Sequence, residues 1–330
     1  MLSVARSLEE GRYQGTIARC LSRAWGEVSA RALVRLLALP DAVRVVAVGG
    51  ATLGGSGKTP LAIACARELA RQGARVAFVG HAYRAHPGRA RFVSPDDALD
   101  EVGDEALVAA RALEAHGVRV VVARSRAVAV ELAARGVDVL VLDGVLQTAP
   151  RRASLSLLAV DAEEPWGRAE AVPPRGDLRA PVAALVAAAD LVVRVGEDSA
   201  DARVTSDGAR LGDTLLSWEA LRPLRLGLAC ALGRPRRLLR SLARHGITPV
   251  ATALGADHAP LAAGALQHPV DLWLATAKCA LHMPRTRAPL ATLDHEVVCS
   301  RTLSARLSGR LDASPALTRV VASNNLKSHE

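Results

Sequence analysis

Aromatic side chains are scarce in this sequence of 330 residues, which contains two Phe, two Tyr and four Trp. Proteins that bind single-stranded nucleic acid stack the bases on aromatic rings, so this scarcity argues against that class. Half of the residues are apolar, mostly Ala, Val and Leu, and aliphatic packing must therefore form the core. A chain of this length predicts one large or two moderate α/β domains.

The sequence also lacks paired cysteines and long apolar runs. Its five cysteines are widely spaced, with no C-x-x-C, which indicates free thiols in a reducing compartment. No run of 18 uncharged apolar residues is present, and residues 1–15 lack the apolar segment of a signal peptide. We therefore expect a cytoplasmic protein with no membrane span, which can still bind a membrane surface.

Positive charge is in excess, with a formal net charge of +9 at pH 7. This excess favours an anionic partner such as a phospholipid surface, a nucleotide or a nucleic acid. A GC-rich genome would enrich Ala and Arg in the same way, so charge alone decides little. Nucleic-acid binding would rest on charge alone, and we do not expect it.

Residues 16–39 show the spacing of one long amphipathic helix that ends before Pro40. Its apolar positions are Ile17, Leu21, Trp25, Val28, Ala32, Leu36 and Leu39, and its interleaved basic positions are Arg19, Arg23, Arg31 and Arg35. Two interpretations fit this pattern. The helix packs its apolar side on its own domain, or it lies on an anionic membrane surface.

From residue 43 onward, apolar strand-like runs alternate with helical segments that end at a glycine. We predict strands at 43–50, 74–80, 118–123 and 137–144, and helices at 58–73, 104–117 and 125–136. Strands this apolar are typical of a parallel sheet covered by helices on both faces. A loop-rich segment at 161–181 is followed by further α/β structure, with strands at 224–233 and 270–277, a helix at 234–246 and a frayed end at 311–330. The fold class is a P-loop NTPase-like, doubly wound, mostly parallel α/β sheet with a second, smaller α/β domain.

The stretch VAVGGATLGGSGKTPLAIACARELARQG, residues 46–73, predicts a strand, a glycine-rich loop and a helix. Such loops need glycine because backbone N–H groups must approach phosphate oxygens closely. Lys58 would reach the β- and γ-phosphates of ATP, and the Thr59 hydroxyl would ligate Mg²⁺. The predicted nucleotide-binding residues are Thr52, Leu53, Gly54, Gly55, Ser56, Gly57, Lys58 and Thr59.

Two further features bear on this nucleotide site. Thr52 stands where the G-x-x-x-x-G-K-[ST] pattern has its first glycine. Asp143 follows an apolar strand, where P-loop proteins place a carboxylate that holds Mg²⁺. The alternative for Asp143 is an aspartate that caps a turn.

The segment GGATLGGSGKTP resembles the N-x-T-x-G-G-T-G-K-T-P loop of the tetraacyldisaccharide 4′-kinase family, in which threonine fills the first-glycine position. Six further segments resemble that family in the same order along nearly the whole chain. They are VGDE, VLVLDGVLQ, the loop ending in GDLRAP, CALGRPRRLLRSLARHG, GADHAPL and LATAKCALHM, the last of which resembles T-E-K-D-A-V-K. Seven short motifs in one order are a specific signal.

This resemblance implies a kinase that transfers the γ-phosphate of ATP to the 4′-hydroxyl of a tetraacylated glucosamine disaccharide 1-phosphate, giving lipid IVA. It implies a peripheral protein at the cytoplasmic face of the bacterial inner membrane. It also implies a membrane-docking helix region at 1–40, a P-loop core at 41–184, a hinge at 185–222 and a smaller domain at 223–330. We expect a monomer.

Residue roles follow from the same resemblance where the motifs match. Asp104 corresponds to the catalytic base, and His258 to the histidine that supports it. Glu105 would reach Mg²⁺ together with Thr59 and Asp143. Arg179 is a candidate for holding a phosphate, with an ordinary surface arginine as the alternative, and Gln147 is a second candidate for contacting substrate.

Several positions depart from the family pattern near the site. Gly144 replaces the second of two aspartates, Thr148 replaces a histidine, and Ala277 and Cys279 replace two carboxylates. Losing a supporting partner commonly costs roughly 10–100-fold in activity rather than all of it. We therefore expect a divergent but active kinase, with a catalytically impaired, ATP-binding paralogue as the alternative. A third interpretation, an ATPase or GTPase of the partitioning or metallochaperone type, leaves the VGDE and GDLRAP matches unexplained.

Overall fold

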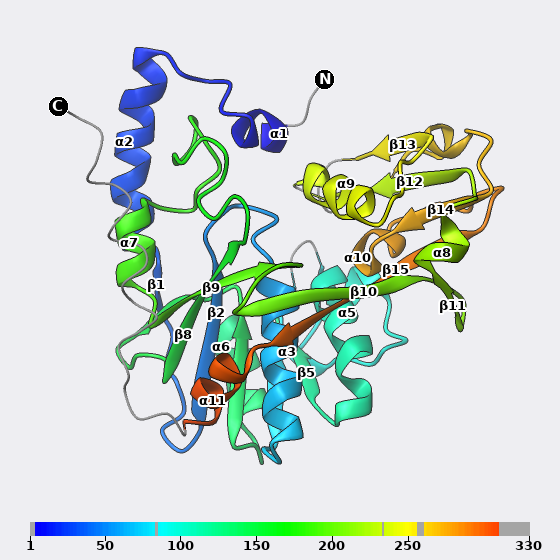
Figure 1. Cartoon of the computed structure of the whole chain (residues 1–330). Coiled ribbons are helices and arrows are strands. Elements are labelled where there is room, and N and C mark those ends of the chain that lie inside the picture. The colour runs from blue at the N-terminus through cyan, green and yellow to red at the C-terminus, as the bar shows by residue number, and fades with distance from the viewer. Residues whose placement is uncertain (1–3, 83–84, 233, 256–260, 310–330) are drawn as a thin grey trace.

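The computed structural model describes residues 4–82, 85–232, 234–255 and 261–309. One large sheet of 13 strands organises this part of the chain, in the order β13-β12-β14-β15-β10-β9-β8-β2-β6-β3-β5-β4, with β11 paired to β10. Helices surround each end of the sheet, so that two lobes are visible in Figure 1. Strands β10 and β15 run between the lobes.

The first lobe is the predicted doubly wound core. Its parallel strands are β2 (Arg44–Gly50), β3 (Val76–Val79), β5 (Arg119–Val122), β6 (Val139–Asp143), β8 (Leu155–Asp161) and β9 (Leu191–Gly196), and β4 (Arg91–Phe92) is an antiparallel edge. Alternate residues of β2 face opposite cores. Val46 and Val48 pack with helices α3 (Lys58–Arg71) and α5 (Asp104–Leu113), whereas Val45 and Ala47 pack with α6 (Arg126–Ala133). The central strands are buried on both faces, which confirms the predicted fold class.

The second lobe also contains parallel strands, but it joins the first through antiparallel ones. Its parallel strands are β12 (Leu226–Cys230), β13 (Ala251–Leu254) and β14 (Leu272–Ala275), with helices α8 (Trp218–Leu221), α9 (Pro235–Arg244) and α10 (Ala277–Ala280). The joining strands are β10 (Ala202–Leu211) and β15 (Leu290–Cys299), and β11 (Thr214–Ser217) pairs with β10 alone. Helix α11 (Arg301–Ser308) then returns to pack against α3. Residues 185–222, the predicted hinge, thus contribute strands to one continuous sheet, and the division into domains stays a prediction.

Short elements connect these parts. They are α1 (Val4–Glu9), α4 (Leu99–Val102), α7 (Val182–Ala187), strand β7 (Gln147–Ala149) and the 3₁₀ turns Glu114–His116 and Ala263–Leu266. The predicted loop-rich segment begins at Asp161, the last residue of β8, and residues 162–181 form no helix and no strand apart from the isolated bridge at Leu178. Residues 311–330, predicted to fray, lie outside the described part of the chain.

The long helix predicted over residues 16–39 is wrong in its second half. Helix α2 spans Thr16–Arg31, and Val34–Leu36 form a strand, β1, that pairs in parallel with β7. Leu37 and Leu39 are buried in the core. The helical spacing continues past residue 31, but backbone pairing with a segment more than 100 residues away overrides it.

Helix α2 turns its polar side toward the protein and its apolar side outward. Its buried residues are Ser22, Gly26 and Ser29, and the Ser22 hydroxyl donates a hydrogen bond to the Val172 carbonyl oxygen at 2.8 Å. A side chain at Gly26 would lie 3.3 Å from Pro181, which shows how closely the helix approaches that loop. The residues Ile17, Leu21, Trp25 and Val28 are each exposed by 50% or more. The interpretation that α2 packs its apolar side on its own domain is therefore wrong.

Helix α2 stands at the edge of the molecule, beside α7 (Figure 1). Among the residues that the structure describes, no helix is both long enough and apolar enough to cross a membrane.

Candidate active site

The glycine-rich loop connects β2 to α3, as predicted, and two of its glycines cannot be replaced without strain. Gly55 and Gly57 adopt φ angles of 72° and 79°, in the left-handed region that favours glycine. A side chain at Gly57 would also lie 2.9 Å from Val195, and one at Gly55 would lie 2.6 Å from Arg234. Glycine at these two positions therefore lets Val195 and Arg234 pack directly against the loop backbone.

Thr52 fits the loop without such strain. The one non-glycine residue with positive φ in the described chain is Glu170, so Thr52 does not need the freedom of the glycine that it replaces. Its hydroxyl donates a hydrogen bond to the Gly54 carbonyl oxygen at 2.7 Å, and its backbone pairs with Leu178. The threonine therefore braces the start of the loop.

Three charged side chains meet the Thr59 hydroxyl at the start of α3. Thr59 Oγ1 donates to Oδ2 of Asp143 at 2.7 Å, and Lys58 Nζ lies 3.0 Å from Oε1 of Glu105 and 3.9 Å from Oδ2 of Asp143. Burial disfavours the charged form of Lys58, but Asp143 and Glu105 outweigh it and raise the lysine's pKa. Burial raises the pKa of Asp143, whose side chain is fully enclosed at the end of β6.

This group of oxygen atoms fits a magnesium ion. Oδ1 of Asp143 is buried and has no hydrogen-bond partner among the described residues. The Thr59 hydroxyl bonds to Oδ2 of the same carboxylate, and Lys58 lies within 4 Å of both this carboxylate and that of Glu105. No group of three or more His, Cys, Asp or Glu side chains in the described chain could hold a metal by itself. Mg²⁺ typically takes only one or two carboxylates and completes its shell with water and phosphate oxygens, so this sparse set is suitable.

Asp104, the predicted base, is the first residue of α5 and is buried. Its Oδ1 accepts a hydrogen bond from the Glu105 backbone N–H at 2.7 Å, and its Oδ2 lies 2.9 Å from Nε2 of His282. His282 was not predicted from the sequence. The signal was present, because His282 occupies the last position of the segment that resembles T-E-K-D-A-V-K. His258, the predicted supporting histidine, lies outside the described residues.

Lys278, also not predicted as a site residue, comes from the same part of the second lobe. It lies on α10, and its Nζ is 3.8 Å from Oε1 of Glu105. Two cations, Lys58 and Lys278, therefore approach the same carboxylate from opposite lobes. A polyanionic ligand placed here would meet positive charge on both sides.

Arg179 braces the loop rather than standing alone on the surface. Its Nε donates to the Thr52 carbonyl oxygen at 2.9 Å, and a terminal nitrogen lies 3.4 Å from the Leu53 carbonyl oxygen. Arg35 and His81 line the same cleft, and Arg126 donates to the Asp143 carbonyl oxygen at 2.7 Å. Four basic side chains are thus placed around the nucleotide loop.

Gln147 is placed apart from these groups. Its side chain is buried, and its Nε2 donates to the Ser156 hydroxyl at 2.9 Å. Its Oε1 accepts hydrogen bonds from the backbone N–H groups of Thr148 and Ala153. The amide is therefore engaged in holding β7 and the following turn, away from the residues that line the cleft.

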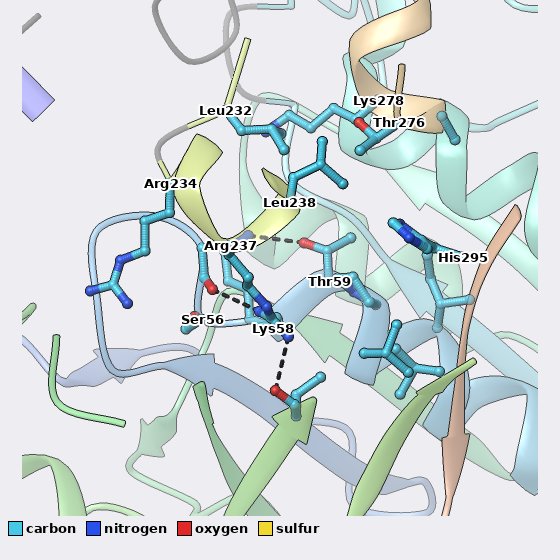
Figure 2. A pocket seen from close by; sticks show the side chains of 18 of the residues that line it. Ser56, Lys58, Thr59, Leu232, Arg234, Arg237, Leu238, Thr276, Lys278 and His295 are labelled. Atoms are coloured by element: carbon cyan, nitrogen blue, oxygen red, sulfur yellow. Dashed lines mark hydrogen bonds between the residues drawn. The ribbon is translucent and has the colours of Figure 1, made fainter. Parts of the chain in front are cut away.

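A cleft of about 1610 Å³ between the lobes is lined by the glycine-rich loop, Glu105, Arg179 and Lys278. Figure 2 shows Lys58 and Thr59 below Arg237 and Leu238 of α9, with Lys278 above and His295 of β15 to one side. Arg237 donates to the carbonyl oxygens of Gly55 and Val195 at 3.0 and 2.8 Å. Helix α9 is therefore attached directly to the glycine-rich loop.

Comparisons with known proteins agree with this geometry. The sequence model of the family described as LpxK, tetraacyldisaccharide-1-P 4′-kinase, matches residues 21–312. The chain is 30% identical over 259 residues to the tetraacyldisaccharide 4′-kinase of Allorhizobium ampelinum, covering 76% of this chain and 74% of that protein. It is 34% identical over 265 residues to the tetraacyldisaccharide 4′-kinase of Xanthobacter autotrophicus, covering 76% and 75%.

The fold is also similar to that of a solved structure. LpxK from Aquifex aeolicus, in a crystal structure described as an apo form in complex with ATP, gives a TM-score of 0.63 at 20% identity, covering 88% of this chain and 96% of that one. At this identity the similarity shows the fold alone. The family model, however, spans most of the chain, and two relatives of at least 30% identity match three quarters of it. The chain therefore belongs to the tetraacyldisaccharide-1-P 4′-kinase family.

Proposed function

We propose that this protein transfers the γ-phosphate of ATP to the 4′-hydroxyl of tetraacyldisaccharide 1-phosphate, giving lipid IVA. One observation carries the proposal beyond family membership. Glu105 contacts Lys58 of the nucleotide loop and follows Asp104 directly in the chain, so the base and the phosphate-binding groups adjoin. A kinase needs these two halves of its chemistry next to each other.

The loop of residues 52–59 binds the phosphates of ATP through its backbone N–H groups. Lys58 is paired with Glu105, and the phosphates of ATP would take over as partners of the lysine. Thr59, Asp143 and Glu105 would hold Mg²⁺, which when bound neutralises charge on the β- and γ-phosphate oxygens. The retained loop residues and the unpartnered Oδ1 of Asp143 support this assignment.

Asp104 acts as the general base. The acceptor oxygen forms a bond to the γ-phosphorus, the bond between that phosphorus and ADP breaks, and the hydroxyl proton passes to the Asp104 carboxylate. Most of the acceleration comes from positioning and charge neutralisation by Lys58 and the loop amides.

The acceptor is anionic, and the basic side chains around the loop suit it. Arg179 would hold a phosphate group, and Arg35 and His81 line the same cleft. A planar guanidinium fits phosphate oxygens in a two-pronged contact. A substrate contact by Gln147 stays a prediction, and its buried amide does not favour it.

The apolar face of α2 would dock the enzyme on the cytoplasmic face of the inner membrane. Exposed apolar residues with arginines among them suit an anionic bilayer surface. The alternative, a catalytically impaired ATP-binding paralogue, is disfavoured because Asp104 retains an imidazole partner. We expect a monomer.

The test is transfer of labelled phosphate from ATP to tetraacyldisaccharide 1-phosphate in detergent micelles. Asp104→Asn is the matched variant, because the amide keeps the shape of the side chain and its bond to the Glu105 N–H. We expect lipid product from the wild type, a loss of about 10²–10⁴-fold in the variant, and unchanged ATP binding by both. ATP binding without any lipid product from the wild type would favour the impaired paralogue.

A further inference from the structure

The Asp104–His282 contact joins two parts of the chain that are 178 residues apart. Asp104 begins α5 in the core, whereas His282 follows α10 in the second lobe. The two side chains are 3% and 14% exposed, so water screens their interaction little. A buried contact between lobes, at the reacting carboxylate, needs an explanation beyond general packing.

The placement of His282 is fixed by its own surroundings. The Thr276 hydroxyl accepts a hydrogen bond from the Cys279 N–H and caps α10, and the His282 N–H donates to the Cys279 carbonyl oxygen at 3.0 Å. The Cys279 sulfur is buried and accepts a hydrogen bond from the Ala231 N–H. The imidazole therefore projects from an anchored turn.

The same turn also reaches the neighbouring carboxylate. Lys278 lies 3.8 Å from Glu105, while His282 contacts Asp104, so one short element of the second lobe contacts two consecutive acidic residues. Oδ1 of Asp104 accepts a hydrogen bond from the Glu105 N–H, and Oδ2 lies 2.9 Å from Nε2 of His282. The second lobe thus sets the direction of the base.

We propose that His282 is a positioning residue that orients the Asp104 carboxylate toward the acceptor hydroxyl. This inference rests on the proposed function, in which Asp104 takes the hydroxyl proton. His282 acts through Asp104 and accepts no proton from the substrate. The T-E-K-D-A-V-K pattern has a lysine at this position, so this chain uses an imidazole where the pattern has an ammonium group, and both can donate a hydrogen bond to a carboxylate.

The experiment compares steady-state kinetics of the wild type with His282→Leu, which removes the donor, and with His282→Gln and His282→Lys, which keep one. We expect the Leu variant to lose about 10–100-fold in kcat, with the KM for ATP unchanged. The Gln and Lys variants should recover most of that loss. If His282 had a purely structural role, kcat would not depend on whether the side chain at this position carries a hydrogen-bond donor.

His258→Leu is measured beside these variants, because the family resemblance gives the supporting role to His258. Full kcat in His282→Leu, with the loss confined to His258→Leu, would overturn the proposal. If His282→Leu does not fold, His282→Asn replaces it, since its shorter amide cannot span the same distance and should show the same kcat loss. A wild type that binds ATP but makes no lipid product would overturn the proposed function, and this inference with it.

Discussion

The Thr59 hydroxyl donates a hydrogen bond to Oδ2 of Asp143 across 2.7 Å, joining the first turn of α3 to the end of β6. Strands β2 and β6 pair with Val48 opposite Asp143, and this register brings the Asp143 carboxylate to the end of the sheet where the loop after β2 begins. The bond satisfies one carboxylate oxygen and leaves Oδ1 buried without a partner among the described residues. A buried, half-satisfied carboxylate costs stability, and it persists where a ligand is to be bound.

Asp143→Asn should therefore stabilise the ligand-free protein and inactivate it. Burial raises the pKa of Asp143, so the ionised form opposes folding at neutral pH, and stability should fall as pH rises from the unfolded pKa through the folded one. The amide removes that cost, and we expect a melting temperature equal to or higher than that of the wild type, with at least 100-fold less phosphate transfer.

The matched control is Asp138→Asn at the surface. Hydrogen bonds from Arg75 lower the pKa of Asp138 to about 2, so its ionised form favours folding and this variant should not be stabilised. Thermal melting of both variants, with and without ATP and Mg²⁺, checks these expectations. A clear drop in melting temperature for Asp143→Asn would contradict the argument.

The protein should lose stability when one partner of the buried ion pair between Asp177 and Arg234 is removed. Two guanidinium nitrogens of Arg234 lie 2.6 and 3.1 Å from Oδ2 of Asp177. Both side chains are less than a tenth exposed. Asp177→Ala leaves an unpaired buried cation, which typically costs roughly 3–5 kcal/mol. The double variant with Arg234→Met should recover part of this loss, as measured by denaturant unfolding. Additive losses in the double variant would mean that the pair is not coupled.

Cys279 should be a thiolate at neutral pH. A hydrogen bond from Cys230, together with those from Thr276 and the Ala231 N–H, lowers its pKa to about 6 despite burial. Because the folded pKa lies below the ordinary value of 9.0, its contribution to stability is full above pH 9 and is lost as pH falls toward 6.

Ultraviolet absorbance of the thiolate measures this directly. We expect a step near pH 6 in the wild type that is missing in Cys279→Ser and kept in Cys20→Ser, which changes an exposed thiol. The difference by which the melting temperature of the wild type exceeds that of Cys279→Ser should grow as pH rises from 6 to 9. A wild-type step only above pH 8 would refute the low pKa.

The exposed face of α2 should carry membrane binding without contributing to stability. Leu21→Ser with Trp25→Ser removes apolar area that faces outward, so sedimentation with vesicles of anionic phospholipid should weaken several-fold while the melting temperature stays unchanged. Ser22→Leu is the opposite control, because it places a large side chain on the buried side and should destabilise the protein. Undiminished vesicle binding by the double variant would argue against this docking face.

Much of the core could be predicted from sequence because its signals are local. The apolar runs that became β2 and β6 and the helix after the glycine-rich loop depend on neighbouring residues alone. Lys58, Thr59 and Asp143 were predicted in the same way, since a loop and a strand end mark them. The strands β10 and β15 were missed because they form an antiparallel pair with mixed exposure, in which no continuous apolar run appears.

The amino-acid sequence by itself determined the alternation of strands and helices, the nucleotide loop and the family, because each depends on residue order over short distances. The tertiary structure decided which side of α2 faces outward, why Gln147 is enclosed, and which described histidine meets Asp104. Each of these depends on contacts between segments more than 100 residues apart. Spacing along a chain carries no information about such contacts until the sheet has brought the segments together.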